Sequence, residues 1–307
     1  MKKRILIVLQ DFRGGGAERV AVLLANGLYE IGFELKVLAL DISGPMREGL
    51  NESISVERIP AKRILRSPLA LSKKISNFRP EWVISHMTHV NVAVLIAKFL
   101  TRWRCKYIVI EHNHIQKNIV YKRRLVRLSY HTTKLLYRFA NGLVCVSDGV
   151  AKSLSGFTGI DQNRMQVIHN PVINQRLISL SNKQTKQPDH HKFFDNNKKV
   201  ILAVGSLTAQ KGYMGLLSVF KEVQKSCRCL LIILGEGDQR HALEEKIIEL
   251  GLQDIVDMPG FCNKPYQMMQ HADLYVLPSL WEGLPTVLIE ALLFSKKIIA
   301  ADCISGP

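Results

Sequence analysis

Two glutamates on either side of a Gly-Leu-Pro turn form the stretch of this chain best suited to chemistry. Glu282 and Glu290 follow the apolar run 273–279, which reads as a short buried strand, and a helix is expected to begin near Pro285. Glu290 is then predicted to lie about two turns into that helix. At the carboxyl edge of parallel sheets, helix N-termini favour diphosphates, and carboxylates can accept hydrogen bonds from sugar hydroxyls. Taken alone, the pattern would be better explained by two solvated glutamates at a helix start, so its weight comes from the surrounding residues.

Three further candidates each follow a predicted strand. Gly14-Gly-Gly16 would let backbone amides approach a ligand, although the spacing is not a dinucleotide fingerprint and a tight turn is the alternative. Lys211 could neutralise a diphosphate, or be a surface lysine that opens a helix. His112 ends a strand, where the backbone could equally satisfy its ring. No convincing metal-ligand spacing accompanies these residues, so no metal site is predicted.

Apolar runs of strand length alternate with helical patterns along the chain, which is typical of parallel α/β units. The sequence therefore predicts two doubly wound parallel sheets, as Rossmann-like domains that face a cleft. We expect one domain over residues 1–172, a linker with a polar insertion over 173–198, and a second domain over 199–307. The expected strands are 5–9, 35–40, 82–85, 107–110, 142–146 and 166–168, then 200–204, 230–234, 255–258, 274–277 and 298–301.

The positive charge of the chain is concentrated in its first half. Residues 1–170 hold 27 Lys and Arg against 12 Asp and Glu, whereas residues 171–307 hold 15 against 14. The first half therefore suits an anionic partner. No apolar run reaches the ~20 residues of a membrane helix, and the start of the chain reads as a strand rather than a signal peptide. Six scattered cysteines indicate a reducing cytoplasm.

Two stretches, 62–74 and 122–138, mix basic with apolar residues. In the second, four leucines could share an apolar face with basic residues at its margins, and such a face can lie on an anionic membrane. These leucines are Leu125, Leu128, Leu135 and Leu136. An ordinary amphipathic helix that packs inward and solvates its basic residues is the alternative. Nucleic acid is not expected as a partner, because no helix-turn-helix, zinc-finger or RNA-binding motif is present.

Several segments, in this order, resemble the retaining glycosyltransferases of family 4, which have the GT-B fold. They are GGGAER at 14–19, EHN at 111–113, VSD at 146–148, VIHNP at 167–171, VGSLTAQKG at 204–212, LGEGD at 234–238, PGF at 259–261, ADLYVLPS at 272–279, the two glutamates, and SGP at 305–307. The resemblance covers nearly the whole chain and is more specific in its second half. It implies that a sugar moves from a nucleotide donor, expected to be UDP-linked, to a glycan acceptor hydroxyl, and that the anomeric configuration is retained.

The resemblance also implies roles for individual residues. Lys211 would bind the diphosphate leaving group, Glu290 the ribose hydroxyls, and Glu282 and His112 the donor sugar or the reacting centre. Family members usually carry an arginine five positions before this lysine. Here that position is Ser206, which can donate a hydrogen bond but brings no charge.

Other donor contacts implied by the resemblance involve backbone amides and one aromatic ring. The implied residues are Gly15 and Gly16 near the reacting centre, Gly235 in a glycine turn, Phe261 at the base, and Gly283 and Leu284 beside the sugar and phosphate. Gly235 and Phe261 fit plain strand-to-helix turns equally well. The nucleotide sugar is a substrate, and neither a metal nor another cofactor is implied, since the D-x-D motif of metal-dependent transferases is absent.

Retention without an obvious nucleophile suggests front-face attack by the acceptor, with double displacement through a carboxylate as the alternative. The leading hypothesis is a cytoplasmic enzyme, peripheral on the inner face of the membrane, that extends a lipid-linked glycan for cell-surface polysaccharide. The resemblance leads us to expect further elements beyond Pro307, so we expect a C-terminally truncated member with an incomplete second domain. A remnant that is inactive or only binds donor is therefore one alternative. A nucleotide-sugar epimerase is another, although the paired glutamates argue against it.

Overall fold

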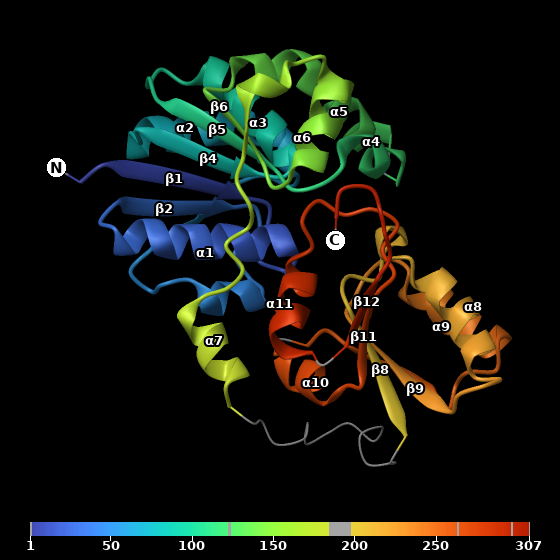
Figure 1. Cartoon of the computed structure of the whole chain (residues 1–307). Coiled ribbons are helices and arrows are strands. Elements are labelled where there is room, and N and C mark those ends of the chain that lie inside the picture. The colour runs from blue at the N-terminus through green and yellow to red at the C-terminus, as the bar shows by residue number, and fades with distance from the viewer. Residues whose placement is uncertain (1, 122–123, 184–197, 263, 296, 307) are drawn as a thin grey trace. The chain divides into compact units, whose positions relative to one another are not determined.

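The computed structural model describes residues 2–121, 124–183, 198–262, 264–295 and 297–306. The chain divides into two compact units, Met1–Pro171 and Val172–Pro307, and each is built around one parallel sheet (Figure 1). The prediction of two parallel α/β sheets is confirmed. Most of the polar insertion expected near the domain boundary lies outside the described residues.

Unit 1 contains a seven-stranded sheet in the order β3-β2-β1-β4-β5-β6-β7, and all neighbouring strands are parallel. Its strands are β1 (Arg4–Leu9), β2 (Glu34–Ala39), β3 (Ser55–Arg58), β4 (Trp82–His86), β5 (Lys106–Glu111), β6 (Gly142–Cys145) and β7 (Met165–Val167). Its α-helices are α1 (Gly16–Glu30), α2 (Pro68–Phe78), α3 (Thr88–Leu100), α4 (Ile115–Asn118), α5 (Arg124–Leu136) and α6 (Asp148–Thr158).

The helix α3 forms the centre of one layer of unit 1. It packs against α2 on one side and α5 on the other, on the sheet face opposite α1 (Figure 1). Eight of its 13 residues are buried, and they point in nearly every direction around the helix. A helix that is covered by a sheet and two neighbours has little solvent-facing surface, which explains why its sequence is apolar all round.

The edge strand β3 was not predicted from the sequence. It pairs only with β2, and none of its four residues is buried. A short edge strand that is half solvated does not need a continuous apolar run, so the sequence Ser-Val-Glu-Arg carries no strong strand pattern.

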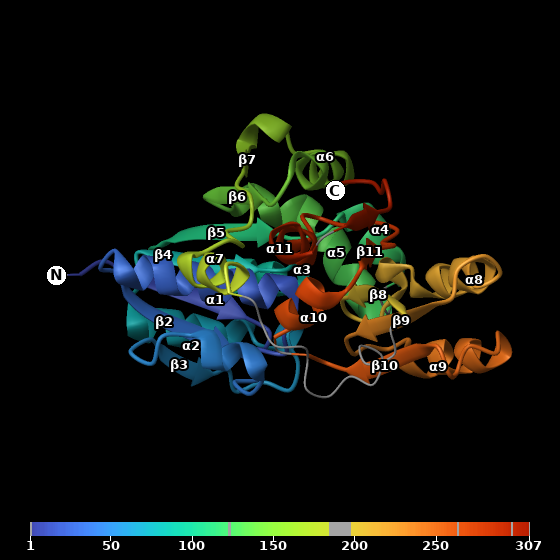
Figure 2. The same ribbon diagram turned by 60° about the horizontal axis from the view of Figure 1, so that its bottom comes forward.

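Unit 2 contains a five-stranded sheet in the order β10-β9-β8-β11-β12, and its neighbouring strands are also parallel. Its strands are β8 (Lys199–Val204), β9 (Cys229–Leu234), β10 (Val256–Gly260), β11 (Leu274–Leu277) and β12 (Ile298–Ala300). Its α-helices are α7 (Gln175–Ser181), α8 (Tyr213–Val223), α9 (Arg240–Glu249), α10 (Tyr266–His271) and α11 (Thr286–Phe294). Figure 2 shows α8 and α9 on one side of this sheet and α10 and α11 on the other.

Each face of the second sheet has its own apolar cluster. One cluster joins the sheet to Leu217 and Phe220 of α8 and to Leu243 of α9. The other joins it to Met269 of α10 and Phe294 of α11. The central strands are therefore covered on both faces, which accounts for their uninterrupted apolar sequences.

The helix that carries Glu290 begins where the sequence predicted. Pro285 is the N-cap residue of α11, and Thr286 is its first residue. Glu290 is the fifth residue and so lies about one turn into the helix, not two turns as expected. None of the helices in the described part of the chain is long and apolar enough to cross a membrane.

Candidate functional site

A buried ion pair lies at the carboxyl edge of the second sheet. Lys211 ends the 3-10 helix Ala209–Lys211 that follows β8, and Glu282 lies in the loop between β11 and α11. Lys211 Nζ is 2.6 Å from Glu282 Oε1, and the two side chains are 12% and 6% exposed. At this burial the charges are screened much less than those of a surface pair.

Glu282 accepts two further hydrogen bonds, from side chains that the sequence analysis did not identify. Ser279 Oγ donates to Oε1 at 2.7 Å, and Gln210 Nε2 donates to Oε2 at 3.1 Å. Because an ionised carboxylate has about four lone-pair positions, these three donors leave acceptor capacity on Oε2. The structure therefore brings the predicted residues Lys211 and Glu282 together as an ion pair.

The loops that carry this pair are also joined through their backbones. Leu280 N donates to Gln210 O at 2.8 Å. Gly212 has a φ of +67°, and a Cβ atom at this position would lie 2.2 Å from Pro278 O. Only glycine meets both conditions, so the glycine that follows Lys211 is required by this close approach of two loops.

The glycine turn after β9 packs against the backbone that follows β8. A Cβ atom on Gly235 would lie 1.9 Å from Gly205 O, and one on Gly237 would lie 2.2 Å from Leu207 O. Loop packing alone therefore demands both glycines. The contact of Gly235 with the nucleotide-sugar donor stays a prediction. The close approach of Gly205 O already explains why position 235 is a glycine.

Glu290 is 1% exposed within unit 2 and lies near the phenol of Tyr275 on β11. Burial, the neighbouring Tyr213, and the charges of Glu290 and Glu282 all raise the pKa of Tyr275 well above its usual value. Both glutamates of the spaced pair therefore act on the same buried hydroxyl group.

The other predicted residues of unit 2 follow neighbouring strands at the same edge of the sheet. Ser206 is exposed after β8, and Phe261 is 45% exposed after β10. Gly283 is buried and Leu284 is half-buried, both after β11. Because carboxyl ends of parallel strands meet at one edge, an exposed aromatic ring, a cation and two carboxylates are brought to that edge.

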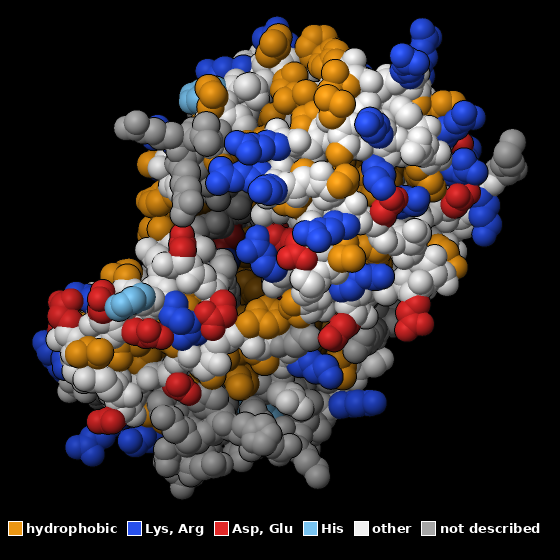
Figure 3. Space-filling view, turned by 180° about the vertical axis from the view of Figure 1, so that it is seen from behind, with side chains coloured by type: hydrophobic (Ala, Val, Ile, Leu, Met, Phe, Trp, Pro, Cys, Tyr) orange, Lys and Arg blue, Asp and Glu red, His pale blue; other side chains and the backbone are white. Residues whose placement is uncertain are grey.

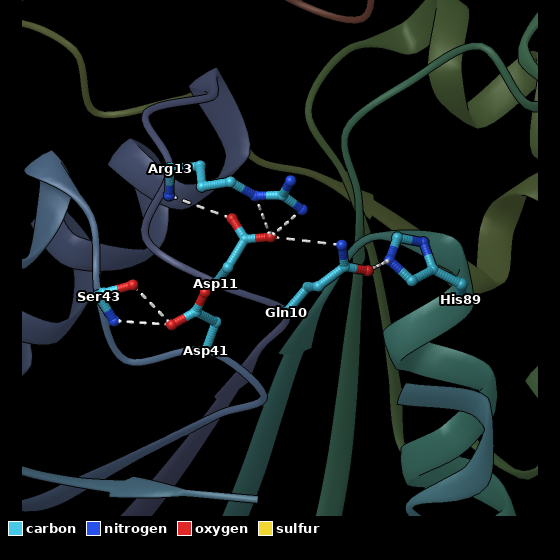
Figure 4. A network of polar contacts seen from close by, with 6 residues as sticks. All are labelled: Gln10, Asp11, Arg13, Asp41, Ser43 and His89. Atoms are coloured by element: carbon cyan, nitrogen blue, oxygen red, sulfur yellow. Dashed lines mark hydrogen bonds and ion pairs between the residues drawn. The ribbon is translucent and has the colours of Figure 1, made fainter. Parts of the chain in front are cut away.

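In unit 1, a polar network follows β1 (Figure 4). Asp11 is buried and accepts hydrogen bonds from the Arg13 guanidinium, at 2.8 Å from Nε and 2.6 Å from Nη2. Gln10 donates to Asp11 at 3.3 Å and also contacts the ring of His89 in α3. The network ties the end of β1 to the first turn of α3, and the sequence carried no pattern that would reveal it.

The glycine-rich turn of unit 1 contains a buried carboxyl group. Glu18 is 9% exposed, and a Cβ atom on Gly15 would lie 2.3 Å from its Oε2. The side chain of Glu18 therefore folds back over the start of α1, beside Gly15. Burial raises the pKa of Glu18 to about 7, and the charge of Asp11 acts in the same direction. Gly15 and Gly16 are exposed at this turn.

His112 follows β5 and meets a second histidine, His86, at the end of β4. Their rings are joined by His86 Nδ1 and His112 Nε2, which are 2.9 Å apart. Burial lowers the pKa of His112 to about 4. Burial, with His112 beside it, also lowers the pKa of His86 well below its usual value. Both imidazoles are therefore neutral at neutral pH.

The residue before His112 is a buried carboxyl group held by three donors. Glu111 is 2% exposed and accepts hydrogen bonds from Thr88 Oγ1 at 2.9 Å, from Asn91 Nδ2 at 3.1 Å, and from the Tyr137 hydroxyl. Burial raises the pKa of Glu111 to about 7, although these donors favour the ionised form. In the sequence Glu111 stands out only as part of a motif, because nothing in its spacing predicts burial.

The predicted site residues thus form two groups. His112, Gly15 and Gly16 belong to unit 1, and the other predicted residues belong to unit 2. Among the residues that the structure describes, no group of three His, Cys, Asp or Glu side chains is placed to hold a metal ion.

Comparisons with known proteins bear on both units. A sequence profile described as Glycosyltransferase Family 4 matches residues 14–176, more than half of the chain, and one described as Glycosyl transferases group 1 matches residues 185–307. An uncharacterized glycosyltransferase of Methanocaldococcus jannaschii is 30% identical over 254 residues, which are 80% of this chain and 61% of that protein. The chain therefore spans less than two thirds of the length of this relative.

A second relative has a defined name. It is the N-acetylgalactosamine-N,N'-diacetylbacillosaminyl-diphospho-undecaprenol 4-alpha-N-acetylgalactosaminyltransferase of Campylobacter jejuni, 24% identical over 99% of this chain and 82% of that protein. Among solved structures, Anabaena Alr3699/HepE in complex with UDP and glucose matches with a TM-score of 0.75 at 20% identity, over 98% of this chain and 81% of that one. This likeness shows a shared fold.

The ion pair at the edge of the second sheet makes a testable contribution to stability. We expect Lys211→Met to lower the free energy of unfolding by about 3 kcal/mol, because Glu282 then stays buried without its cation. The control Lys225→Met breaks an exposed pair with Glu222 and should cost less than about 1 kcal/mol. Urea unfolding measures both, and equal losses in the two variants would contradict a buried, energetically significant pair.

The buried carboxyl of Glu111 should produce a specific pH dependence. Its pKa rises from 4.5 in the unfolded chain to about 7 in the folded protein, so the folded state holds an extra proton between these values. The stabilisation contributed by the protonated Glu111 carboxyl is complete below pH 4.5. It is lost as the pH rises through 7, which lowers the free energy of unfolding by roughly 3 kcal/mol. The stability difference between wild type and Glu111→Gln should therefore shrink from pH 5 to pH 8 in urea titrations. A difference for Glu111→Gln that stays constant over this range would refute the assignment.

Proposed function

The chain belongs to glycosyltransferase family 4 and has its GT-B fold, and we propose that it is a retaining enzyme that transfers a sugar from a UDP-linked donor to a glycan acceptor. One observation carries the donor side of this proposal. Lys211, Glu282, Glu290 and the exposed ring of Phe261 lie at one edge of the second sheet, where open parallel sheets bind their ligands. The choice of UDP is supported by the solved structure of similar fold that holds UDP and glucose.

On this proposal, each part of the donor meets a suited group of unit 2. The Lys211 ammonium has three N–H groups, so it can keep its bond to Glu282 and also donate to the diphosphate. Glu290 would accept hydrogen bonds from the ribose hydroxyls, and Phe261 would stack on the base. The remaining lone pair on Glu282 Oε2 suits a hydroxyl of the donor sugar.

The diphosphate leaving group would be stabilised without a metal cofactor. Lys211 supplies one positive charge, and the backbone amides after Glu282, at Gly283 and Leu284, precede the N-terminus of α11. Ser206 would donate one hydrogen bond in place of the arginine found in relatives. We expect activity to persist in the presence of a metal chelator.

The reaction would proceed by front-face attack. The acceptor oxygen forms a bond to the anomeric carbon as the bond from that carbon to the diphosphate oxygen breaks, and the hydroxyl proton passes to the departing phosphate. The products are a glycoside of retained configuration and UDP. Because His112 is neutral, it would serve as a hydrogen-bond donor at the reacting centre and not as a charged acid.

The acceptor that fits best is a lipid-linked glycan of a cell-surface polysaccharide pathway. This inference draws on the Campylobacter relative, whose name specifies an undecaprenyl-diphosphate-linked substrate. An enzyme that extends such an acceptor works at a membrane surface, on the cytoplasmic side where nucleotide sugars are made. We propose that unit 1 docks there, and its charge supports this: from Trp82 to Ser147 the chain holds 11 Lys and Arg and a single acid, the buried Glu111.

The helix α5 would provide the contact with lipid. Its inward residues are Ser129, Tyr130 and Thr133, which are all buried, whereas Leu128 and Leu135 are 64% and 63% exposed. Leu136 is half-buried and does not share this outward face, contrary to expectation, and the side chain of Leu125 lies outside the described residues. The alternative of a helix that packs its leucines inward is therefore wrong for Leu128 and Leu135.

The outward face of α5 also carries charge and continues beyond the helix. Arg127, Lys134 and Arg138 are exposed on this segment. Phe139 and Phe99, 43% and 58% exposed, meet edge to face at 5.0 Å beside its end. Figure 3 shows hydrophobic side chains among Lys and Arg over the upper part of the molecule, with few acidic ones. Exposed apolar groups within a basic surface suit an anionic membrane.

Donor binding is tested by calorimetry with UDP. We expect Glu290→Gln and Lys211→Met each to weaken binding about tenfold or more, because each removes a charged hydrogen-bonding group. The exposed pair supplies matched controls, Glu222→Gln and Lys225→Met, which should bind UDP as the wild type does. Folded wild-type protein that binds no UDP would overturn the donor assignment, and conversion of UDP-GlcNAc without an acceptor would indicate an epimerase instead.

Membrane docking is tested by sedimentation with lipid vesicles. Arg127→Glu with Lys134→Glu should weaken binding to phosphatidylglycerol vesicles about tenfold or more, since each cation near the surface contributes about 1 kcal/mol. Leu128→Ser with Leu135→Ser should weaken it through lost apolar contact. The control reverses two exposed lysines of unit 2, Lys221→Glu with Lys225→Glu, and should bind as the wild type does. If all three variants sediment equally, α5 is not the docking surface.

A further inference from the structure

The two histidines at the end of β4 and β5 meet edge to edge and not face to face. Their ring centroids are 5.1 Å apart, the ring planes differ by only 23°, and the facing nitrogens are 2.9 Å apart. Nearly coplanar rings with nitrogens this close share one proton along the line between them. One of the two must donate and the other must accept.

The surroundings of His86 decide which ring donates. His86 is 1% exposed, and its Nε2 has no hydrogen-bond partner within the described residues. A neutral imidazole carries one proton. If His86 accepted at Nδ1, its proton would sit on the buried Nε2 without an acceptor. If it donates from Nδ1, Nε2 holds only a lone pair, and buried acceptors without a donor are more common in proteins than buried N–H groups without an acceptor.

The backbone holds His86 in this place. His86 pairs with Ile110 in the register of β4 and β5, and Met87 N donates to Ile110 O at 3.2 Å. Met87 then adopts a φ of +76°, which is strained for a residue with a long side chain, and α3 begins at the next position. A turn of this kind persists only where the surrounding structure enforces it.

We propose that His86 is a positioning residue: its Nδ1–H donates to Nε2 of His112 and holds His112 in the tautomer that carries its proton on Nδ1. Nε2 of His112 is then occupied and cannot accept a proton from substrate. The ring instead presents a fixed, neutral N–H donor from the end of β5, where His112 is half-buried. The use of the His112 N–H group at the reacting centre rests on the proposed glycosyl transfer. The assignment of the His112 tautomer does not depend on it.

The tautomer can be read directly by long-range proton–nitrogen correlation on protein labelled with 15N-histidine. The His112 signals are assigned by their loss in His112→Gln. We expect a protonated Nδ1 and an unprotonated Nε2 in the wild type. A protonated Nε2 on His112 would overturn the proposal.

Substitutions at His86 test the cause. His86→Leu and His86→Met remove the donor, and His112 should then shift towards its Nε2–H form; two variants guard against one that fails to fold. His86→Gln offers an amide N–H and should restore the wild-type pattern. If the His112 signals in either donor-free variant match those of the wild type, His86 does not set the tautomer.

Kinetics separate this proposal from the proposed function. In His86→Leu and His86→Met, which lack the hydrogen-bond donor, kcat should fall roughly fivefold or more, in line with the smaller fraction of the competent tautomer. The KM for the nucleotide sugar should change little. His86→Gln should recover most of the loss. Unchanged kcat despite a shifted tautomer would overturn the positioning role. A wild type that transfers no sugar would refute the proposed function and leave the spectroscopic result standing.

Discussion

The carboxylate of Glu282 is the group on which the ligand edge of the second unit depends. A buried carboxylate persists only when donors replace water, and here Lys211, Ser279 and Gln210 do so. These donors come from the loops after β8 and β11, which are adjacent strands. The ion pair therefore joins the two loops and fixes the ammonium of Lys211 in place. The close approach at Gly212 follows from the same contact, because the loops could not meet if a side chain stood there.

The two units treat charge in different ways. Unit 2 has a net charge close to zero and keeps one charged pair buried at its sheet edge. Unit 1 carries nearly all of the excess positive charge, while its own sheet edge buries neutral histidines, two carboxyls whose pKa is raised to about 7, and Asp11, which is paired with Arg13. On the proposed function, this separation is physically sensible. A diphosphate needs a cation, a sugar hydroxyl needs hydrogen bonds, and a lipid surface needs exposed basic groups.

The sequence predicted the positions of the buried strands well, because strands covered on both faces read as continuous apolar runs. It did not predict β3, whose residues are half solvated at the sheet edge. It could not predict that Lys211 pairs with Glu282, since these residues are 71 positions apart and meet only through the strand order. His86 was overlooked for a similar reason, because its importance arises from the register that sets it against His112. Glu18 was read only as part of a motif, since an acid in the first turn of a helix is ordinarily solvated.

The helix α5 buries hydroxyl-bearing residues on one face and exposes two leucines on the other. Glu111 is buried below this helix, and a buried carboxyl must be surrounded by donors. Tyr137, directly after α5, donates a hydrogen bond to Glu111. Burial raises the pKa of Tyr130 on the inner face of the helix, and the charge of Glu111 raises it further. Ser129 and Thr133, also buried on this face, donate to backbone carbonyls of the helix itself, those of Val126 and Tyr130. Ser129, Tyr130 and Thr133 thus occupy the inner face of α5, and Leu128 and Leu135 lie on its exposed face beside Arg127 and Lys134.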